Sequence, residues 1–585
     1  MSLEDLCNVV ERCQAQPEDG YTPEDYDLFM IAGRSCIEEG NSAQVLSIVL
    51  DDKSQDLVRS IGWSLFPALV EGLLRKEDKD HPNYLAIFNH LLQTCRPKEL
   101  LIGLQEQLGV EDAQTKVERL LLLMQPLQKT LLRLDAPRRA SSLGLTLSSM
   151  MDHVAELPLP ETKEQEQDDV FSLCRCCSEL MEFVRPFIQE AAHNNKPSNS
   201  TYEQEVRAEL HIFFMSALKR IVLEVRLEDP ETLELSPLRS FASDILKHLS
   251  AIGVSLPGLV FLPLTRRKKL PDFLEEETRH PKDALASLAH LVYVHHMATD
   301  TFPCVFSPVY TLRVNLEHVC HLLSSTNSTR IQKGLDLLEK TLQRVDDHSL
   351  PVELLEIKTF LTLSQELEKV MTYSPEQEVR TKGLKVFQLT IDKFDHEAKY
   401  TFFKLVLKTS SHSGLQGYII KNIKNQVDFA LQPGNTNSWF GGVHLLPLLR
   451  FVFILPDGPE TDLLKFLDRV MESLNLLRYL VIRDKVADNK TGIWTDFSQM
   501  EESFLKPLRF GLNMSRAHYE KELSGTMVGS QVKAENINVS VGDQTLPQMT
   551  PDSQMQALHS ALHMFDMMES VLVRIEELVE TKDQK

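Results

Sequence analysis

A fourteen-residue pattern occurs twice in this chain, in copies that begin 49 residues apart at Lys333 and Lys382. Both copies open with Lys-Gly-Leu and close on an apolar residue followed by aspartate, at Asp346 and Asp395. In the first copy, apolar residues recur every three or four positions, which is the spacing of one face of an α-helix. The repeat therefore predicts two equivalent amphipathic helices in successive units. The apolar stripe of the first copy is Ile331, Leu335, Leu338, Leu342 and Val345.

The second copy begins with a helix start signal. Pro375 and the acidic residues after it suit a first helical turn, and Val379 and Arg380 follow. A Val-Arg-x-x-small-Leu opening on a unit of this length resembles a HEAT repeat, whose period is roughly 40 to 47 residues. The alternative is a chance likeness between two amphipathic helices.

The length of 585 residues exceeds what one hydrophobic core normally supports, whereas a solenoid escapes that limit because each unit packs only on its neighbours. No series of alternating strands is evident, and apolar stripes of helical period recur along the chain. The sequence predicts an all-α fold, a right-handed α-solenoid of HEAT-like helical repeats in two halves. The expected helical stretches are 43–50, 56–74, 82–95, 116–134, 285–297, 401–408, 415–431, 463–483 and 556–580.

A charged segment suits a boundary between the halves. Residues 266–269 are Arg-Arg-Lys-Lys, and three consecutive glutamates follow at 275–277. The prediction is an N-terminal half at 1–265, a linker at 266–284 and a C-terminal half at 285–585. The basic run could be a nuclear localisation signal, although a solvated loop is the commoner reading of such a run. Loops are expected at 156–169 and 193–201, and a loop or weak hairpin at 524–552.

Nine cysteines are scattered through the chain, which begins without a basic region followed by an apolar one. This pattern predicts reduced thiols and a cytoplasmic protein. No uninterrupted apolar run of about 18 residues occurs, so no membrane insertion is expected.

The formal net charge of −22 argues against general nucleic-acid binding, which needs a surplus of Lys and Arg on the docking face. The charge is uneven, because residues 401–530 hold 15 Lys and Arg against 13 Asp and Glu. The remaining residues hold 62 − 15 = 47 against 84 − 13 = 71, a balance of −24. The less acidic stretch is a candidate contact surface, with ordinary variation along a long chain as the alternative.

Motifs that carry catalytic or metal chemistry are not evident. Cys174, Cys176 and Cys177 lie on an apolar helical pattern and have no second ligand pair, so they are interpreted as core residues rather than a zinc site. His295 and His296 lie in an expected apolar helix and are interpreted as structural. The phosphate-binding and nucleophile motifs are missing from the sequence, so no cofactor, metal or catalytic residue is predicted.

A protein-binding surface is the remaining prediction. In the expected helix at 415–431 the polar positions fall opposite the apolar stripe, and Arg, Tyr and Trp follow downstream. For the aromatic residues, half-buried packing is the alternative. The candidate partner-binding residues are Lys421, Lys424, Asn425, Asp428, Trp439, Arg478, Tyr479, Arg509, Arg516 and Tyr519.

Nearly the full length resembles the glomulin family of HEAT-like repeat proteins, and the likeness thins at 196–235 and 524–552. Long runs of residues carry this likeness, rather than catalytic signatures. They include Cys174–Cys177, Leu355–Leu361, Ile419–Gln426, Ser473–Ile482, Thr491–Trp494, Phe504–Leu508 and His559–Leu562.

The resemblance implies a non-enzymatic inhibitor that binds the RING-box subunit of cullin-RING ubiquitin ligases through its C-terminal half and blocks the ubiquitin-conjugating enzyme. It also implies immunophilins and a receptor tyrosine kinase as partners. Two alternatives stay open: an adaptor or transport-type solenoid scaffold binding such partners, and an enzyme with an unrecognised site.

Overall fold

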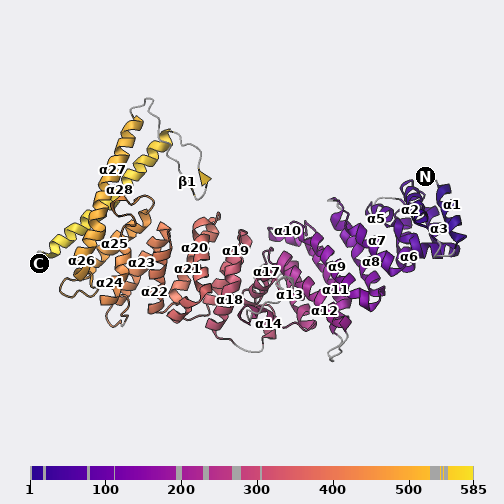
Figure 1. Cartoon of the computed structure of the whole chain (residues 1–585), viewed down its shortest axis with the longest axis horizontal. Helices are drawn as coiled ribbons and strands as arrows, with labels where there is room; N and C mark the ends of the chain where they lie inside the picture. Colours follow the sequence, from indigo (N-terminus) through magenta and orange to yellow (C-terminus); the bar gives the residue numbers. More distant parts are fainter. Residues whose placement is uncertain are drawn as a thin grey trace. The chain divides into compact units, whose positions relative to one another are not determined.

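The computed structural model describes the chain at residues 3–16, 21–75, 79–110, 112, 114–192, 201–227, 236–265, 279–302, 306–435, 437–527, 540–541, 544–545 and 551–583. Within these ranges almost all regular structure is helical, and successive helices pack on their neighbours along the chain (Figure 1). The predicted all-α class is confirmed, and the architecture is a helical-repeat solenoid.

The chain divides into two compact units, Met1–Lys340 and Thr341–Lys585. This division lies further along the chain than the linker expected at 266–284. Residues 266–278 of that linker lie outside the described residues, so the linker itself stays a prediction.

The first unit consists of α-helices joined by short turns, 3-10 segments and one π segment. Its last helix continues two residues past the division. The α-helices are α1 (Leu3–Gln14), α2 (Pro23–Glu38), α3 (Ser42–Leu50), α4 (Gln55–Ile61), α5 (Phe66–Leu74), α6 (His81–Thr94), α7 (Pro97–Leu108), α8 (Lys116–Arg133), α9 (Ala136–Ala155), α10 (Lys163–Gln167), α11 (Leu173–Ala192), α12 (Thr201–Ala217), α13 (Pro237–Ala251), α14 (Leu256–Val260), α15 (Leu262–Thr265), α17 (Lys282–Tyr293), α18 (Pro308–Leu323) and α19 (Ser328–Leu342). The 3-10 segments are η2 (Asp52–Ser54), η3 (Gly62–Leu65) and η5 (Thr299–Thr301), and the π segment is η4 (Leu218–Val222).

The second unit continues the helical pattern and ends in two long helices. Its α-helices are α20 (Lys358–Tyr373), α21 (Gln377–Lys393), α22 (His396–Thr409), α23 (Ser413–Ala430), α24 (Gly442–Val452), α25 (Leu467–Arg483), α26 (Ile493–Met500), α27 (Lys506–Met527) and α28 (Pro551–Asp583). The shorter segments are the 3-10 turns η6 (Val352–Glu356) and η7 (Gly458–Glu460) and the π segment η8 (Glu501–Leu505).

Both copies of the repeat are helices, α19 and α21, as predicted. Glycine is needed at the shared position because each helix approaches the preceding helix closely there. A Cβ added at Gly334 would lie 3.0 Å from Leu322 Cβ, and one at Gly383 would lie 3.2 Å from Met371 Cγ. The glycine of the repeat thus marks a helix crossing.

Residues 56–74 do not form the single regular helix expected there, because the 3-10 segment η3 interrupts it between α4 and α5. By length and composition the stretch Asp52–Leu74 is apolar enough to cross a membrane, although 72% of its most apolar window is buried inside the protein. Packing in the core accounts for its composition, so it is weak evidence for a membrane span.

Two local predictions were wrong. The stretch 156–169 is not only a surface loop, since it contains α10, whose Glu166 is 5% exposed and accepts a hydrogen bond from the Leu238 backbone N–H at 3.1 Å. The helix expected at 285–297 ends at Tyr293, so His295 and His296 lie in the turn that follows. His296 has a φ of 55°, which a continuing right-handed helix cannot accommodate.

The predicted weak hairpin before the last helix is present as a short antiparallel pair, β1 (Ser540–Val541) with β2 (Gln544–Thr545). Helix α27 runs to Met527, slightly past the expected start of the loop at 524. Residues 193–200 lie outside the described residues, so that expected loop stays a prediction.

The cysteine cluster is part of the core of α11. Cys174, Cys176 and Cys177 are all buried, as the sequence predicted. Burial raises the pKa of the Cys174 and Cys176 thiols to about 12, and raises that of Cys177 as well.

Candidate partner-binding surface

Helix α23 presents the predicted polar face. His412 caps its start by accepting a hydrogen bond from the Leu415 N–H at 3.2 Å. The apolar positions of the stripe are buried, and the helix ends just before half-buried Leu431. Lys421 and Asn425 are exposed, while Lys424 and Asp428 are half-buried. The exposed side of α23 thus holds Lys421 and Asn425, with Lys424 and Asp428 at its border. The buried residues of the stripe are Leu415, Ile419, Ile423 and Val427.

Helix α25 packs against α23 (Figure 1). Near its start, Arg469 Nη1 donates to Gln416 Oε1 at 3.0 Å. Near its end, the Tyr479 hydroxyl donates to Asp428 Oδ1 at 2.5 Å. These two contacts show that α23 and α25 run in the same direction, and Arg478, next to Tyr479, is exposed.

The Tyr479–Asp428 bond has an electrostatic signature. Burial, together with the bond to the Asp428 carboxylate, raises the pKa of Tyr479 to about 12. The phenol therefore stays protonated and donating at neutral pH. Tyr479 and Asp428 hold the two helices together. The cations near this contact are Lys421, Lys424 and Arg478.

Sequence reasoning missed the apolar component of this face. Phe429 is 42% exposed and follows Asp428, and Ile482 on α25 is 53% exposed. Ile482 falls one position beyond the buried stripe that ends at Val481, so an apolar residue outside the stripe was the signal that could have found it. We use the name α23–α25 face for the exposed and half-buried residues Lys421, Lys424, Asn425, Phe429, Arg478 and Ile482 of these two helices; the Phe429 ring also lies 6.0 Å from the His396 ring of α22.

Trp439 does not join the α23–α25 face. It is half-buried in the segment before α24, where its ring lies 5.3 Å from Tyr400 and 5.4 Å from His444 between centroids. Its backbone N–H donates to Asn437 Oδ1 at 3.1 Å. Trp439 is thus engaged in packing, which is the alternative considered for it from the sequence.

The remaining predicted residues connect α27 with α28. Arg509 Nε donates to Glu576 Oε1 at 3.2 Å, and Arg516 Nη2 donates to Glu569 Oε2 at 2.5 Å. The Tyr519 ring packs edge-on against Phe565, with centroids 5.4 Å apart. Each of these three residues thus has a contact with α28 within the second unit.

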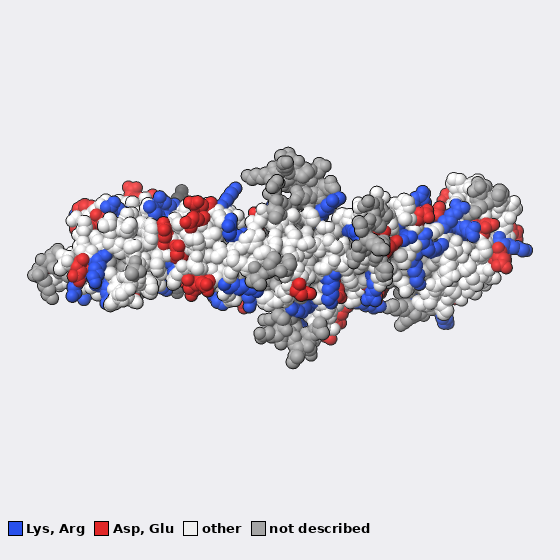
Figure 2. Space-filling model, turned by 90° about the horizontal axis from the view of Figure 1, so that it is seen from below, with Lys and Arg blue, Asp and Glu red and all other residues white. Residues whose placement is uncertain are grey.

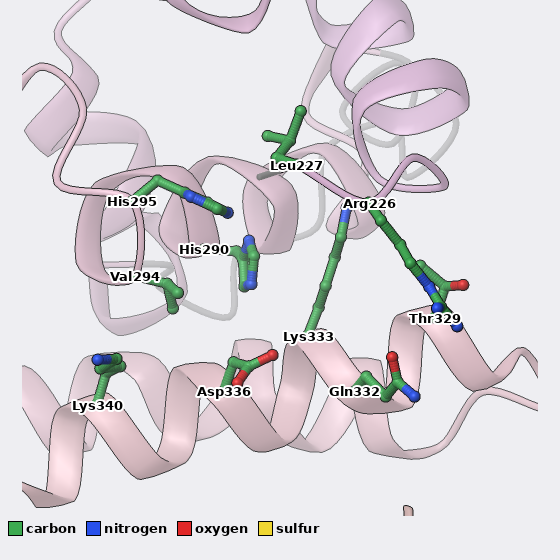
Figure 3. Close-up of a pocket in the computed structure, with 10 residues that line it drawn as sticks. All are labelled: Arg226, Leu227, His290, Val294, His295, Thr329, Gln332, Lys333, Asp336 and Lys340. Atoms are coloured by element: carbon green, nitrogen blue, oxygen red, sulfur yellow. The ribbon is translucent and has the colours of Figure 1, made fainter. Parts of the chain in front are cut away.

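A pocket of about 310 Å³ lies in the first unit, between α19 and the end of α17 (Figure 3). Lys333 crosses one end of it, and its Nζ donates to the carbonyls of Val222 at 2.7 Å and Leu223 at 2.8 Å. Burial lowers the pKa of Lys333 to about 7, while the Glu224 carboxylate favours the charged form. The pocket is lined by Arg226, Leu227, His290, Val294, His295, Thr329, Gln332, Lys333, Asp336 and Lys340.

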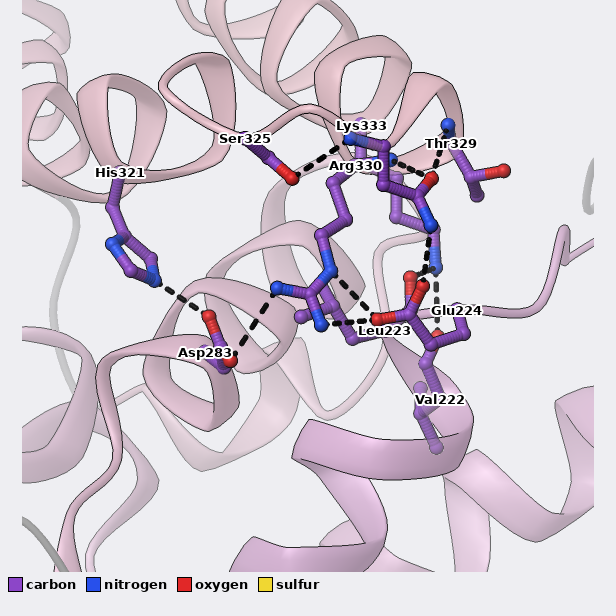
Figure 4. A network of polar contacts seen from close by, with 10 residues as sticks. Val222, Leu223, Glu224, Asp283, His321, Ser325, Thr329, Arg330 and Lys333 are labelled. Atoms are coloured by element: carbon purple, nitrogen blue, oxygen red, sulfur yellow. Dashed lines mark hydrogen bonds and ion pairs between the residues drawn. The ribbon is translucent and has the colours of Figure 1, made fainter. Parts of the chain in front are cut away.

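A polar network beside the pocket ties three helices to the end of η4 (Figure 4). Arg330 Nε donates to Glu224 Oε1 at 2.6 Å, and Asp283 bonds His321 Nε2 at 2.6 Å. The bond from His321 is the main cause of a lowered pKa for Asp283. These contacts hold α17, α18 and α19 in place, so we assign the network a structural role.

Metal ligation is not suggested by the part of the chain that the structure describes, which contains no group of three or more His, Cys, Asp or Glu able to hold an ion. The α23–α25 face combines cations with exposed apolar groups, as protein interfaces do.

Comparison with known proteins gives a consistent assignment. Residues 8–561 match the model of a family described as "Uncharacterised protein family, YAP/Alf4/glomulin". The chain is 43% identical to glomulin of Homo sapiens and 42% identical to glomulin of Mus musculus, in each case covering 100% of this chain and 98% of the relative.

Among solved structures, importin beta aligns with 98% of this chain and 68% of its own, at 11% identity and a TM-score of 0.23. Kap121p aligns with 98% of this chain and 60% of its own, at 14% identity and a TM-score of 0.20. The assignment rests on the sequence matches, which extend over almost the whole chain: this protein belongs to the YAP/Alf4/glomulin family.

Proposed function

We propose that this protein is a non-enzymatic inhibitor of cullin-RING ubiquitin ligases. It binds the RING-box subunit and blocks recruitment of the ubiquitin-conjugating enzyme. Family membership over nearly the full chain supports the proposal, together with the function that the resemblance to glomulins implies.

The α23–α25 face is the proposed contact surface in the second unit. Its exposed apolar groups, Phe429 and Ile482, supply the area that a partner buries, and Lys421 and Arg478 supply charges at the margin. Apolar burial contributes affinity, whereas marginal charges mainly set the association rate and its dependence on salt.

Competition is the mechanism that such a surface allows. If the inhibitor and the conjugating enzyme occupy the same surface of the RING domain, binding of one excludes the other. No catalytic residue is needed, and excess conjugating enzyme relieves the inhibition.

The test measures binding of the full chain to a purified cullin–RING-box complex, together with ubiquitin transfer at increasing conjugating-enzyme concentration. Lys421→Glu combined with Lys424→Glu should weaken binding at least tenfold. Lys421 is exposed and Lys424 is half-buried, and both lie outside the buried stripe of α23, so circular dichroism should remain unchanged.

Lys404→Glu combined with Lys408→Glu is the matched control, because it reverses two charges on α22 in the same unit. There the ammonium groups lie over the Phe451 ring, 5.8 Å and 5.0 Å from its centroid. Equal loss in both variants, or a loss in the control alone, would remove the α23–α25 face from the proposal. Inhibition that excess conjugating enzyme fails to relieve would contradict competition.

The remaining proposals concern location and other partners. A cytoplasmic location, and immunophilins and a receptor tyrosine kinase as further partners, are proposed on the resemblance. Co-purification of the tagged full chain from cell fractions tests them, and recovery in another fraction without these partners would refute them.

A further inference from the structure

A row of cations follows one edge of the first unit, where α6 and α8 end and α7 and α9 begin. The row has seven members. Six of their side chains are exposed, and that of Arg139 is half-buried. Figure 2 shows Lys and Arg side chains gathered at the end of the molecule that holds the N-terminal helices. We call this row the basic edge. It comprises Arg59, Arg96, Lys98, Lys129, Arg133, Arg138 and Arg139.

Hydrogen bonds show that the basic edge is continuous. The Arg96 backbone N–H donates to the Arg59 carbonyl at 3.3 Å, which joins α4 to the turn after α6. Arg133 Nη2 donates to the Cys95 carbonyl at 2.9 Å, which brings the end of α8 to the same turn. Arg139 Nη2 then donates to the Leu134 carbonyl at 2.9 Å. Neighbouring helix ends therefore carry these cations side by side.

Two of the guanidinium groups are held in place by helix ends. Arg133 bonds carbonyls at the end of α6, and Arg139 bonds carbonyls at the end of α8 as well as Glu190 Oε1 at 2.9 Å. Unpaired helix carbonyls carry a partial negative charge and favour such cations. Fixed side chains lose little conformational entropy when they bind, so exposed Arg133 is preorganised for a ligand, whereas Arg139 is engaged by Glu190.

The local charge balance is the reverse of that of the whole chain. Glu190 is paired with Arg139, Glu99 is half-buried, and Asp135 is exposed between the cations. Even with exposed Asp56, one turn before Arg59 on α4, the seven cations outnumber the acids named here, in a chain with a net charge of −22. A free nucleic acid would meet repulsion from the rest of such an acidic chain, because its phosphates extend well past a short edge. A short acidic peptide segment would contact the basic edge alone.

We propose that the basic edge docks an extended acidic segment of a partner protein. Packed helices lie roughly 8 to 10 Å apart, and an extended chain advances about 3.3 Å per residue. Successive cations along the edge therefore match acidic residues at about every third position of the segment. This surface is separate from the α23–α25 face and does not depend on RING binding.

The experiment uses the full chain and fluorescence anisotropy with three probes. The first is a peptide of about 15 residues with Glu at every third position, which is about one residue per helix spacing. The second has the same composition with its Glu residues in one block, and the third is single-stranded oligothymidylate of equal charge. The spaced peptide should bind most tightly, and its affinity should fall as salt is raised.

Lys98→Glu combined with Arg138→Glu should weaken binding of the spaced peptide at least tenfold. Both residues lie in the first turns of their helices, α7 and α9, where Glu is favoured by the helix dipole, so the fold should be retained. Arg75→Glu combined with Lys79→Glu is the matched control, because these exposed cations flank the other end of α6, about 20 Å away. The control should stay within about twofold.

Three results would overturn the inference: no binding of the spaced peptide, equal loss in both double variants, or tighter binding of oligothymidylate. The last would assign the basic edge to nucleic acid. Neither double variant should change binding to the cullin–RING-box complex, so failure here and failure of the proposed function are distinguishable.

Discussion

The two copies of the repeat share a pattern in sequence but differ in how deeply their helices are buried. Leu335 of α19 is fully buried, whereas Leu384 at the same position of α21 is 40% exposed. Lys333 is 6% exposed and bonds backbone carbonyls, whereas Lys382 is half-buried. The glycine between them is buried in both helices. The shared pattern therefore reports a helix crossing, while neighbours distant in sequence decide which other positions become core.

The largest expected effect separates the two leucines. Leu335→Asp places an unpaired carboxylate in the core and should lower the free energy of unfolding by about 3 to 5 kcal/mol. Leu384→Asp should change it by less than about 1 kcal/mol, because that side chain already reaches solvent. Urea unfolding followed by circular dichroism, with hydrogen exchange over α19 and α21, measures both. Equal losses would mean that the two copies are equivalent after all.

A smaller effect concerns the two lysines and pH. Burial lowers the pKa of Lys333 to about 7 in the folded protein, from 10.5. Above pH 7 the folded state releases this proton while the unfolded state keeps it, so stability rises with pH toward 10.5. Between pH 7 and 9 the rise should be on the order of 2 kcal/mol. Lys333→Met should abolish it, and Lys382→Met should preserve it. Thermal unfolding at several pH values measures this pH dependence of stability. A profile unchanged by Lys333→Met would show that Lys333 is not its source.

The smallest effect concerns the shared glycines. Alanine is favoured over glycine within a helix by about 1 kcal/mol, so steric fit decides the sign of each substitution. At Gly334 the new methyl would meet Leu322 Cβ, which is fixed to the backbone, so Gly334→Ala should destabilise by about 1 kcal/mol. At Gly383 it would meet Met371 Cγ and Val370 Cγ1 at 3.2 Å, and methionine can adjust, so Gly383→Ala should be about neutral. Melting temperatures of the two variants test this, and the reverse order would refute it.

The sequence predicted helices where local periodicity governs packing. The stripes at 43–50, 116–134 and 415–431 correspond closely to α3, α8 and α23. It failed where the backbone departs from the regular helix, as at the 3-10 segment η3 and at His296. These departures depend on tertiary contacts that a periodic pattern does not encode. The division after Lys340 also lies inside a continuous helix, so composition gave no sign of it.

The candidate surface was only partly predictable for a related reason. Helical spacing placed Lys421 and Asn425 on the exposed side of α23 without any knowledge of the neighbours. By contrast, Arg509 and Arg516 look like interface residues in sequence, but their partners Glu576 and Glu569 lie more than 50 residues away on α28. The binding role of the α23–α25 face itself stays a prediction.

Thiol chemistry follows from the burial of the cysteine cluster. A thiolate is the reactive form, and thiols with a pKa of about 12 are almost wholly protonated at neutral pH, so Cys174 and Cys176 should resist alkylation and oxidation while the fold persists. Cys7 on α1 is exposed, unlike the other cysteines that the structure describes. Cys7 thus offers a position for a thiol-directed dye that is far in sequence from both proposed binding surfaces. Slow labelling of the buried cysteines of α11 would measure how often the core of the first unit opens.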